Sequence, residues 1–170
     1  MRKKYNILLL SLLLVLFVSL SLFLSKPAET LVIYMSPRKM EVDSGDVFEG
    51  KVLLKGTKEH LENVLSVDVK VNYDKDKLGI VSVIPGSFFQ DPMIVKWDQE
   101  QGFFSIAANP TKTEKVKLNT GGEGELLKIE FRAGKKLGSS DVSFDKVTLV
   151  YVSGSGGIYP KQITSTYVIR

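Results

Sequence analysis

The sequence predicts an all-β fold, an antiparallel β-sandwich of roughly nine strands. Apolar and β-branched segments are separated by turn residues (Gly, Pro, Asn, Asp), many of them at the spacing of about 8–12 residues typical of sandwiches. Several segments alternate apolar and polar residues, which gives each strand one buried and one solvated face and favours antiparallel sheets. No segment beyond residue 25 keeps the apolar period of a helix over three turns.

Residues 64–73 form the clearest predicted strand. Its apolar positions are 67, 69, 71 and 73, and its polar row on the opposite face consists of Ser66, Asp68, Lys70 and Asn72. Strict alternation predicts that the apolar positions face the core and that the polar row faces solvent. The polar row is therefore a candidate binding surface.

Eight further strands are predicted at residues 31–35, 46–54, 78–84, 93–97, 102–107, 125–132, 142–152 and 163–169. The segments 93–97 and 102–107 are expected to pair as a hairpin through residues 98–101. Residues 60–65 fit either a short turn of helix or a loop that leads into the strand at 64. The glycine-rich stretches at 120–124 and 153–157 are predicted to be turns, because no helix follows either of them as a phosphate site would require.

The N-terminal segment has the two parts of an export signal. Three basic residues, Arg2, Lys3 and Lys4, precede an almost unbroken apolar run of 18 residues from 7 to 24. That length is at the lower edge of a bilayer-spanning helix, and no clear cleavage site follows. We expect one hydrophobic helix at residues 1–25 (a signal peptide or, preferably, a retained signal-anchor), a linker at 26–30 and a single domain at 31–170. The basic residues favour an extracellular domain, secreted or anchored to the membrane through this segment only.

The charge balance gives no reason to expect a nucleic-acid partner. Without Arg2, Lys3 and Lys4, 20 of the 23 basic residues remain, against 19 acidic ones. The domain is therefore close to neutral, and a mixed solvated surface is expected. The chain has no cysteine, which excludes thiol nucleophiles, disulfides and cysteine-based metal sites.

We expect no enzyme activity, no metal site and no cofactor. The single histidine, His60, lies in a polar stretch without a recognisable triad. The best carboxylate candidates for glycoside hydrolysis are Asp68, Asp98 and Glu125, but most acidic residues of the chain lie in turns or on solvated strand faces, so a role in solvation is preferred. The segment 72–76 has the Asn-x-Asp-x-Asp start of a calcium loop. However, Lys77 replaces the required glycine, so a strand-ending turn is predicted.

Residues 64–89, VLSVDVKVNYDKDKLGIVSVIPGSFF, resemble the signature of the cohesin family. An alternating strand ends in Tyr73-Asp74, a short polar turn precedes Leu78, and a β-rich run ends in Pro85-Gly86 before an apolar pair. The segments 42–54 and 124–144 resemble the early strand and a later pair of strands of the same family. The similarity covers about residues 31–169.

The resemblance implies a nine-stranded jelly-roll sandwich that binds a dockerin module through one sheet face. It implies that Ser66 and Asp68 contact the dockerin, and it places Trp97 where the family often has an aromatic residue at the end of the fifth strand. Asn109 occupies a place where many dockerin-binding members have Glu. Together with Lys70 and Asn72 of the polar row, these residues form the predicted partner-binding set.

Three functions stay open at this point. The first is a non-catalytic, cell-surface binding module with a dockerin-like protein partner, linked to polysaccharide degradation. The second is direct binding of a polysaccharide, which requires at least two exposed, coplanar aromatic rings, with Trp97 as the first candidate. The third is a structural subunit of an envelope, secretion or pilus assembly, which requires an apolar patch or an open strand edge.

Overall fold

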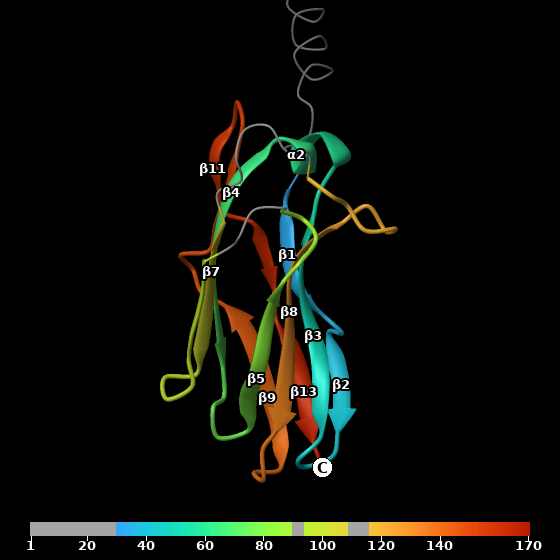
Figure 1. Ribbon diagram of the computed structural model, residues 1–170, viewed down its shortest axis with the longest axis vertical. Helices are drawn as coiled ribbons and strands as arrows, with labels where there is room; N and C mark the ends of the chain where they lie inside the picture. The colour runs from blue at the N-terminus through green and yellow to red at the C-terminus, as the bar shows by residue number, and fades with distance from the viewer. Residues whose placement is uncertain (1–29, 90–93, 109–115) are drawn as a thin grey trace, which may run out of the picture.

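The computed structural model describes residues 30–89, 94–108 and 116–170, and these form a β-sandwich of two sheets (Figure 1). The predicted N-terminal helix, most of the linker and Asn109 lie outside the described residues. Among the residues that are described, no helix is both long and apolar enough to cross a bilayer.

The first sheet has five strands. In spatial order they are β12 (Lys161–Ile163), β1 (Val32–Ser36), β3 (Val47–Lys55), β8 (Gly124–Ala133) and β5 (Leu78–Pro85). All neighbours in it are antiparallel except β1 and β12, which run parallel.

The second sheet has eight strands. Six follow one path, β11 (Gly156–Ile158), β10 (Leu149–Val152), β4 (Val64–Tyr73), β9 (Gly138–Phe144), β13 (Ser165–Ile169) and β2 (Lys39–Val42). The other two are the hairpin β6 (Ile94–Asp98) and β7 (Phe103–Ala108), which joins the sheet through β7 and β4. Strand β4 is the centre of this sheet, since β7 lies along one edge and β10 and β9 lie along the other.

The core lies between the two sheets and confirms the alternation predicted for the long strands. In β4, Val67, Val69 and Val71 are buried, and in β8 the buried residues include Leu127, Ile129 and Phe131. Aromatic rings connect the layers, because Phe131 of the five-stranded sheet contacts two tyrosines of the other sheet. Its ring centroid is 6.2 Å from that of Tyr73 and 6.1 Å from that of Tyr167.

The all-β sandwich is confirmed, but the described residues contain thirteen strands instead of about nine. Strands β2, β11 and β12 are only three or four residues long. β2 and β12 pair with strands far away in sequence, which local patterns do not reveal, while β11 pairs with the preceding strand β10 across the glycine-rich turn. The segment 142–152, predicted as one strand, is two strands, β9 and β10, interrupted at residues 145–148. The predicted hairpin of 93–97 with 102–107 is present as β6 and β7, while Met93 lies outside the described residues.

A short helix, α2 (Lys58–Glu62), precedes β4 and decides between the two interpretations of residues 60–65. The Thr57 side chain accepts a hydrogen bond from the His60 amide (3.3 Å), as an N-cap residue does. Leu61 is buried, so the helix closes this end of the sandwich. His60 therefore belongs to a short structural helix.

Candidate protein-binding face

The predicted polar row lies on the outer face of the eight-stranded sheet. Ser66, Asp68, Lys70 and Asn72 alternate with the buried valines of β4, and Asp68 is the most exposed of the four. We call this surface the outer β4 face; it consists of the polar row and the outward residues of β6, β7 and β10. The structure thus brings four of the six predicted site residues together, and their role in binding stays a prediction.

Apolar side chains surround Asp68. Directly opposite it are Ala107 on β7 and Leu149 on β10, and Ile94 on β6 is opposite Ala107. Residues directly opposite one another on neighbouring strands share a face, so these four form one row across the sheet. Ile94 is 63% exposed. No hydrogen bond or ion pair joins the Asp68 carboxylate to another side chain of the described residues.

A second row begins at Ser66. Its partner on β10 is Tyr151, which is 44% exposed, and Tyr151 in turn is opposite Gly157 on β11. A side chain at Gly157 would meet both neighbouring residues, since its Cβ would lie 3.4 Å from Tyr151 Cε1 and 3.3 Å from Leu149 Cδ1. Tyr151 and Leu149 therefore pack side by side over the bare backbone of Gly157.

The other half of the polar row is engaged within the domain. The Lys70 ammonium group lies 4.6 Å from the centroid of the Phe103 ring, a cation–π contact. The Asn72 side chain donates a weak hydrogen bond to Asp145 (3.5 Å). The Val147 amide, the Asn72 side chain and the charge of Lys70 hold the Asp145 pKa below its ordinary value. Lys70 and Asn72 are thus less free for a partner than Ser66 and Asp68.

The interruption at residues 145–148 stays bonded to the centre of β4. The Asp145 amide donates to the Lys70 carbonyl oxygen at 2.8 Å, and the buried Thr148 hydroxyl lies 3.4 Å from the same oxygen. The segment also presents Val147, which is 61% exposed. The bend therefore exposes an apolar side chain while it keeps β9 and β10 attached to β4.

Trp97 does not join the polar row. Its partner across the β6–β7 hairpin is Phe104, which is fully buried on the core side of β7. Trp97 consequently lies on the opposite face of the sheet from Asp68, at an edge where half of its side chain is exposed. Trp97 and Tyr151 cannot form one coplanar sugar-stacking surface, because they lie on opposite faces. Asn109, the sixth predicted residue, lies outside the described residues.

Our sequence interpretation missed three apolar residues of this face, Ile94, Leu149 and Tyr151. A signal for Tyr151 was present. Val142, Phe144, Val150 and Val152 all face the core, so even positions point inward on both sides of the bend and the odd position 151 points outward. For Ile94 and Leu149 the alternation within each segment predicts a strand, but their place beside Asp68 depends on the register of β6 and β10.

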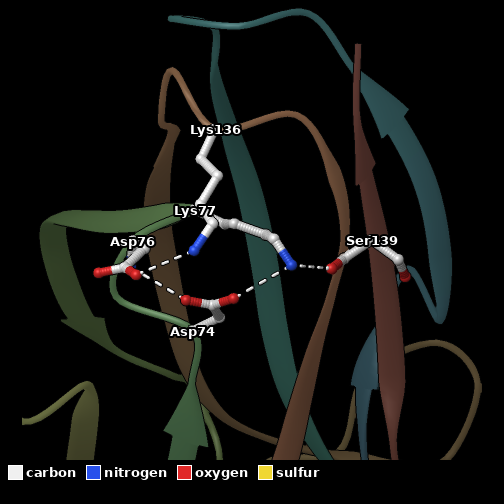
Figure 2. Close-up of polar contacts among 5 residues, drawn as sticks. All are labelled: Asp74, Asp76, Lys77, Lys136 and Ser139. Atoms are coloured by element: carbon white, nitrogen blue, oxygen red, sulfur yellow. Dashed lines mark hydrogen bonds and ion pairs between the residues drawn. The ribbon is translucent and has the colours of Figure 1, made fainter.

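The acidic segment that begins like a calcium loop is the turn between β4 and β5 (Figure 2). Asp74 accepts a hydrogen bond from the Asp76 amide at 3.0 Å, and Lys77 Nζ lies 3.2 Å from Asp74. Lys136 lies 3.1 Å from Asp76. Burial raises the Asp74 pKa, but the bonds from Lys77 and the Asp76 amide more than offset this and hold it below its ordinary value. The ammonium groups of Lys77 and Lys136 thus balance the two carboxylates of this turn.

Within the described parts of the chain, no three His, Cys, Asp or Glu side chains gather in a way that could hold a metal ion. The three carboxylates considered for glycoside hydrolysis do not converge either. Asp68 is on the outer face of β4 and Asp98 is at the end of β6, both in the eight-stranded sheet, while Glu125 is on β8 of the other sheet. The geometry offers a surface for contact with a partner and no constellation for catalysis among these residues.

Comparison with known families agrees with the geometry. The model of the cohesin domain matches residues 34–169. The chain belongs to the cohesin domain family. The cohesin family is one of non-catalytic binding modules, and the match covers nearly all of the described sandwich.

Solved cohesin structures share the fold at low sequence identity. The seventh ScaB type I cohesin of Pseudobacteroides cellulosolvens has a TM-score of 0.69 at 16% identity, over 83% of this chain and 92% of that chain. The Coh-OlpA–Doc918 complex of Clostridium thermocellum, a type I cohesin–dockerin complex, has a TM-score of 0.68 at 16% identity (83% and 99% covered). The second type II cohesin module from the adaptor scaffoldin ScaA of Acetivibrio cellulolyticus has 0.56 at 14% (85% and 94%). No curated protein matches this chain.

Proposed function

We propose that this chain is a non-catalytic protein-interaction module that binds a dockerin module through the outer β4 face. Membership of the cohesin family supports the class of function. Several of the solved structures with the same fold are cohesins bound to dockerins. At identities of 14–16% these structures support the fold alone, so the assignment of the face depends on the residues of this chain.

The observation that carries the proposal is the exposed carboxylate of Asp68, which has no hydrogen-bond or ion-pair partner among the described residues and lies at the centre of a partly apolar row. The outer face of the five-stranded sheet differs, because its central charges are paired with one another. There Lys51 lies 3.5 Å from Glu49 and 3.3 Å from Glu125, and Lys128 lies 3.9 Å from Glu125. Protein interfaces combine an apolar centre with a few hydrogen-bonding groups, and the outer β4 face has this composition.

The proposal includes a location. The basic residues and the apolar run of the N-terminal segment favour a domain held outside the cell, secreted or attached by that segment. A dockerin partner in that place would be recruited to the cell surface. A role in polysaccharide degradation would follow if the recruited protein is a polysaccharide-degrading enzyme.

The test is direct binding of the full chain, kept in mild detergent, to a panel of purified dockerin modules. The panel contains the dockerins encoded by the organism that makes this chain, together with Doc918 as an added probe. We expect at least one dockerin to bind. Asp68→Ala should weaken that binding about tenfold or more, equivalent to ~1.4 kcal/mol, with an unchanged melting temperature.

Glu49→Ala is the matched control, because Glu49 is an exposed carboxylate on the other sheet. Its affinity should stay within about twofold of the parent chain. If none of the dockerins binds, the proposed function is wrong. If one binds but Asp68→Ala behaves like Glu49→Ala, the function stands and the assignment of the face is wrong.

A further inference from the structure

The outer β4 face carries two apolar rims on either side of Asp68. The hairpin rim consists of Leu149 and Tyr151 on β10, and the edge rim is Ile94 on β6. The side chains between the rims are short except for Asp68 itself. In the rows of Asp68 and Tyr151 they are Ala107 on β7 and Ser66 on β4, and the next row along carries Lys70 on β4, Ser105 on β7 and Lys96 on β6. Neighbouring strands are about 4.8 Å apart, so the rims on β10 and β6 are separated by about 14 Å.

The hairpin rim has a specific support. The glycine-rich stretch 153–157, which the sequence predicted only as a turn, places Gly157 under Tyr151 and Leu149. A methyl group at 157 would lie tightly against Leu149 and in ordinary contact with Tyr151, and a larger side chain would displace both residues of the rim. The position of the rim therefore depends on a glycine that does not itself need to touch a partner.

Asp68 determines the charge that a partner must bring. Its carboxylate is exposed now, but a partner that covers both rims would remove it from water. Burial of an unpaired carboxylate is costly, whereas burial with a cation and its hydrogen bonds is not. The lysine two residues along the same strand, Lys70, is occupied by the Phe103 ring and does not pair with Asp68. Lys96 lies in the same row as Lys70 on the outer face, and it has no ion pair with Asp68 either. Since no lysine or arginine of the described residues pairs with Asp68, we expect the compensating charge to come from the partner.

We infer that the outer β4 face binds a protein surface with one lysine or arginine side chain that contacts Asp68. Apolar side chains of the partner surround that cation and cover the two rims. This inference rests on the proposed function and deepens it, because it names the chemistry of the partner surface. It assigns specificity to Ile94, Leu149 and Tyr151 and a positioning role to Gly157.

The charge is tested with the tightest-binding dockerin of the panel as the probe. Asp68→Asn keeps the size of the side chain and one acceptor oxygen but removes the charge, so we expect binding to weaken about tenfold or more. Asp68→Lys should weaken it still further, and a dockerin whose own contacting lysine or arginine is changed to glutamate should restore binding to that variant. If Asp68→Asn binds within about twofold of the parent chain, the partner supplies a neutral donor and the cationic contact is wrong.

The rims are tested with Tyr151→Ser and Ile94→Ser, each expected to weaken binding about tenfold. Gly157→Val should also weaken it, because a branched side chain at 157 would extend beyond the Cβ position, which already touches both residues, and would displace Leu149 and Tyr151. Val47→Ser is the matched control, since Val47 is 48% exposed on the other sheet and should leave affinity unchanged. Melting temperatures verify that every variant is folded.

The outcomes separate this inference from the proposed function. Rim variants that bind like the parent chain, while Asp68→Ala loses binding, would overturn the rims and leave the function intact. If no dockerin of the panel binds the parent chain, the proposed function fails and this inference fails with it.

Discussion

Two buried serines show how strongly a single hydrogen bond affects this core. Ser165 on β13 and Ser140 on β9 are both almost fully buried. The Ser165 hydroxyl donates to the Met35 carbonyl oxygen at 3.0 Å, which connects the two sheets. The Ser140 hydroxyl has no hydrogen-bond partner among the described residues. A satisfied buried hydroxyl contributes to stability, whereas an unsatisfied one costs free energy.

We therefore predict opposite effects for the same substitution at these two positions. Ser140→Ala should raise the free energy of unfolding by about 1 kcal/mol, because it removes a buried polar group without a partner. Ser165→Ala should lower it by about 1–2 kcal/mol, because it removes this buried hydrogen bond between the two sheets. Urea unfolding measures both. A destabilised Ser140→Ala would contradict the prediction and indicate a partner for that hydroxyl.

At the scale of elements, the open edge of β5 shows how the sandwich limits strand addition. β5 pairs only with β8 in the described structure, and its register shifts between Ile80 and Ser82. The strand ends at Pro85, which has no amide hydrogen to donate. A bulge and a proline both disfavour pairing with another chain. The edge of β5 therefore gives little support to the third function considered from the sequence, a structural subunit that assembles by adding a strand of another chain.

Gln99, in the turn between β6 and β7, occupies part of that edge. Its side-chain oxygen accepts from the Ile80 amide at 2.9 Å and from the Tyr73 hydroxyl at 3.0 Å. Its side-chain nitrogen donates to the Leu78 carbonyl oxygen at 3.1 Å. The amide thus takes the place of a strand partner and connects β5 to β4 of the other sheet.

Gln99→Ala should lower the free energy of unfolding by about 1–2 kcal/mol, because three hydrogen bonds are lost. The Ile80 amide should exchange its hydrogen with solvent faster, since it loses its acceptor. Gln101→Ala is the control in the same turn, where no hydrogen bond of the side chain would be removed. Equal exchange at Ile80 in both variants would show that Gln99 does not protect this edge.

At the scale of the whole molecule, three tyrosines with raised pKa values make the free energy of unfolding fall at alkaline pH. Burial, with the nearby charge of Asp98, raises the pKa of Tyr73 to about 12, and burial raises that of Tyr167 to about 12. Burial and the hydrogen bond to Glu123 raise the pKa of Tyr34 to about 12. Their ordinary value is about 10, so the unfolded chain ionises first. Stability from these groups is fully present below pH 10 and is lost as pH rises from about 10 to 12.

Tyr167→Phe tests whether ionisation of a buried tyrosine lowers the stability of the fold at high pH. The substitution keeps the ring in the core but removes one ionisable group and its bond to the Pro37 carbonyl oxygen (3.2 Å). The variant should be somewhat less stable at pH 8, yet it should lose less stability than the parent chain between pH 8 and pH 11. Urea unfolding midpoints at pH 8 and pH 11 measure the difference. Titration of the lysines affects both proteins equally, so it does not contribute to the difference between them. An equal loss in both proteins would mean that Tyr167 ionises normally.

The sequence by itself determined the class of fold and the direction of the side chains on the long strands. A period of two residues is a local property, so the buried valines of β4 and its outward polar row could be read directly. The order of several weak motifs was enough to indicate the cohesin family, which the match over residues 34–169 confirms.

Only the tertiary structure decided what surrounds that row. Which strand lies beside β4, and in which register, depends on contacts across the whole sheet, so the positions of Leu149 and Ala107 next to Asp68 had no local signal. The same dependence placed Trp97 on the opposite face and supplied the short strands β2 and β12 with partners. It also engaged Lys70 and Asn72 within the domain and left Asp68 without a partner among the described residues, because a side chain's partners are set by its neighbours in space and not by its neighbours in sequence.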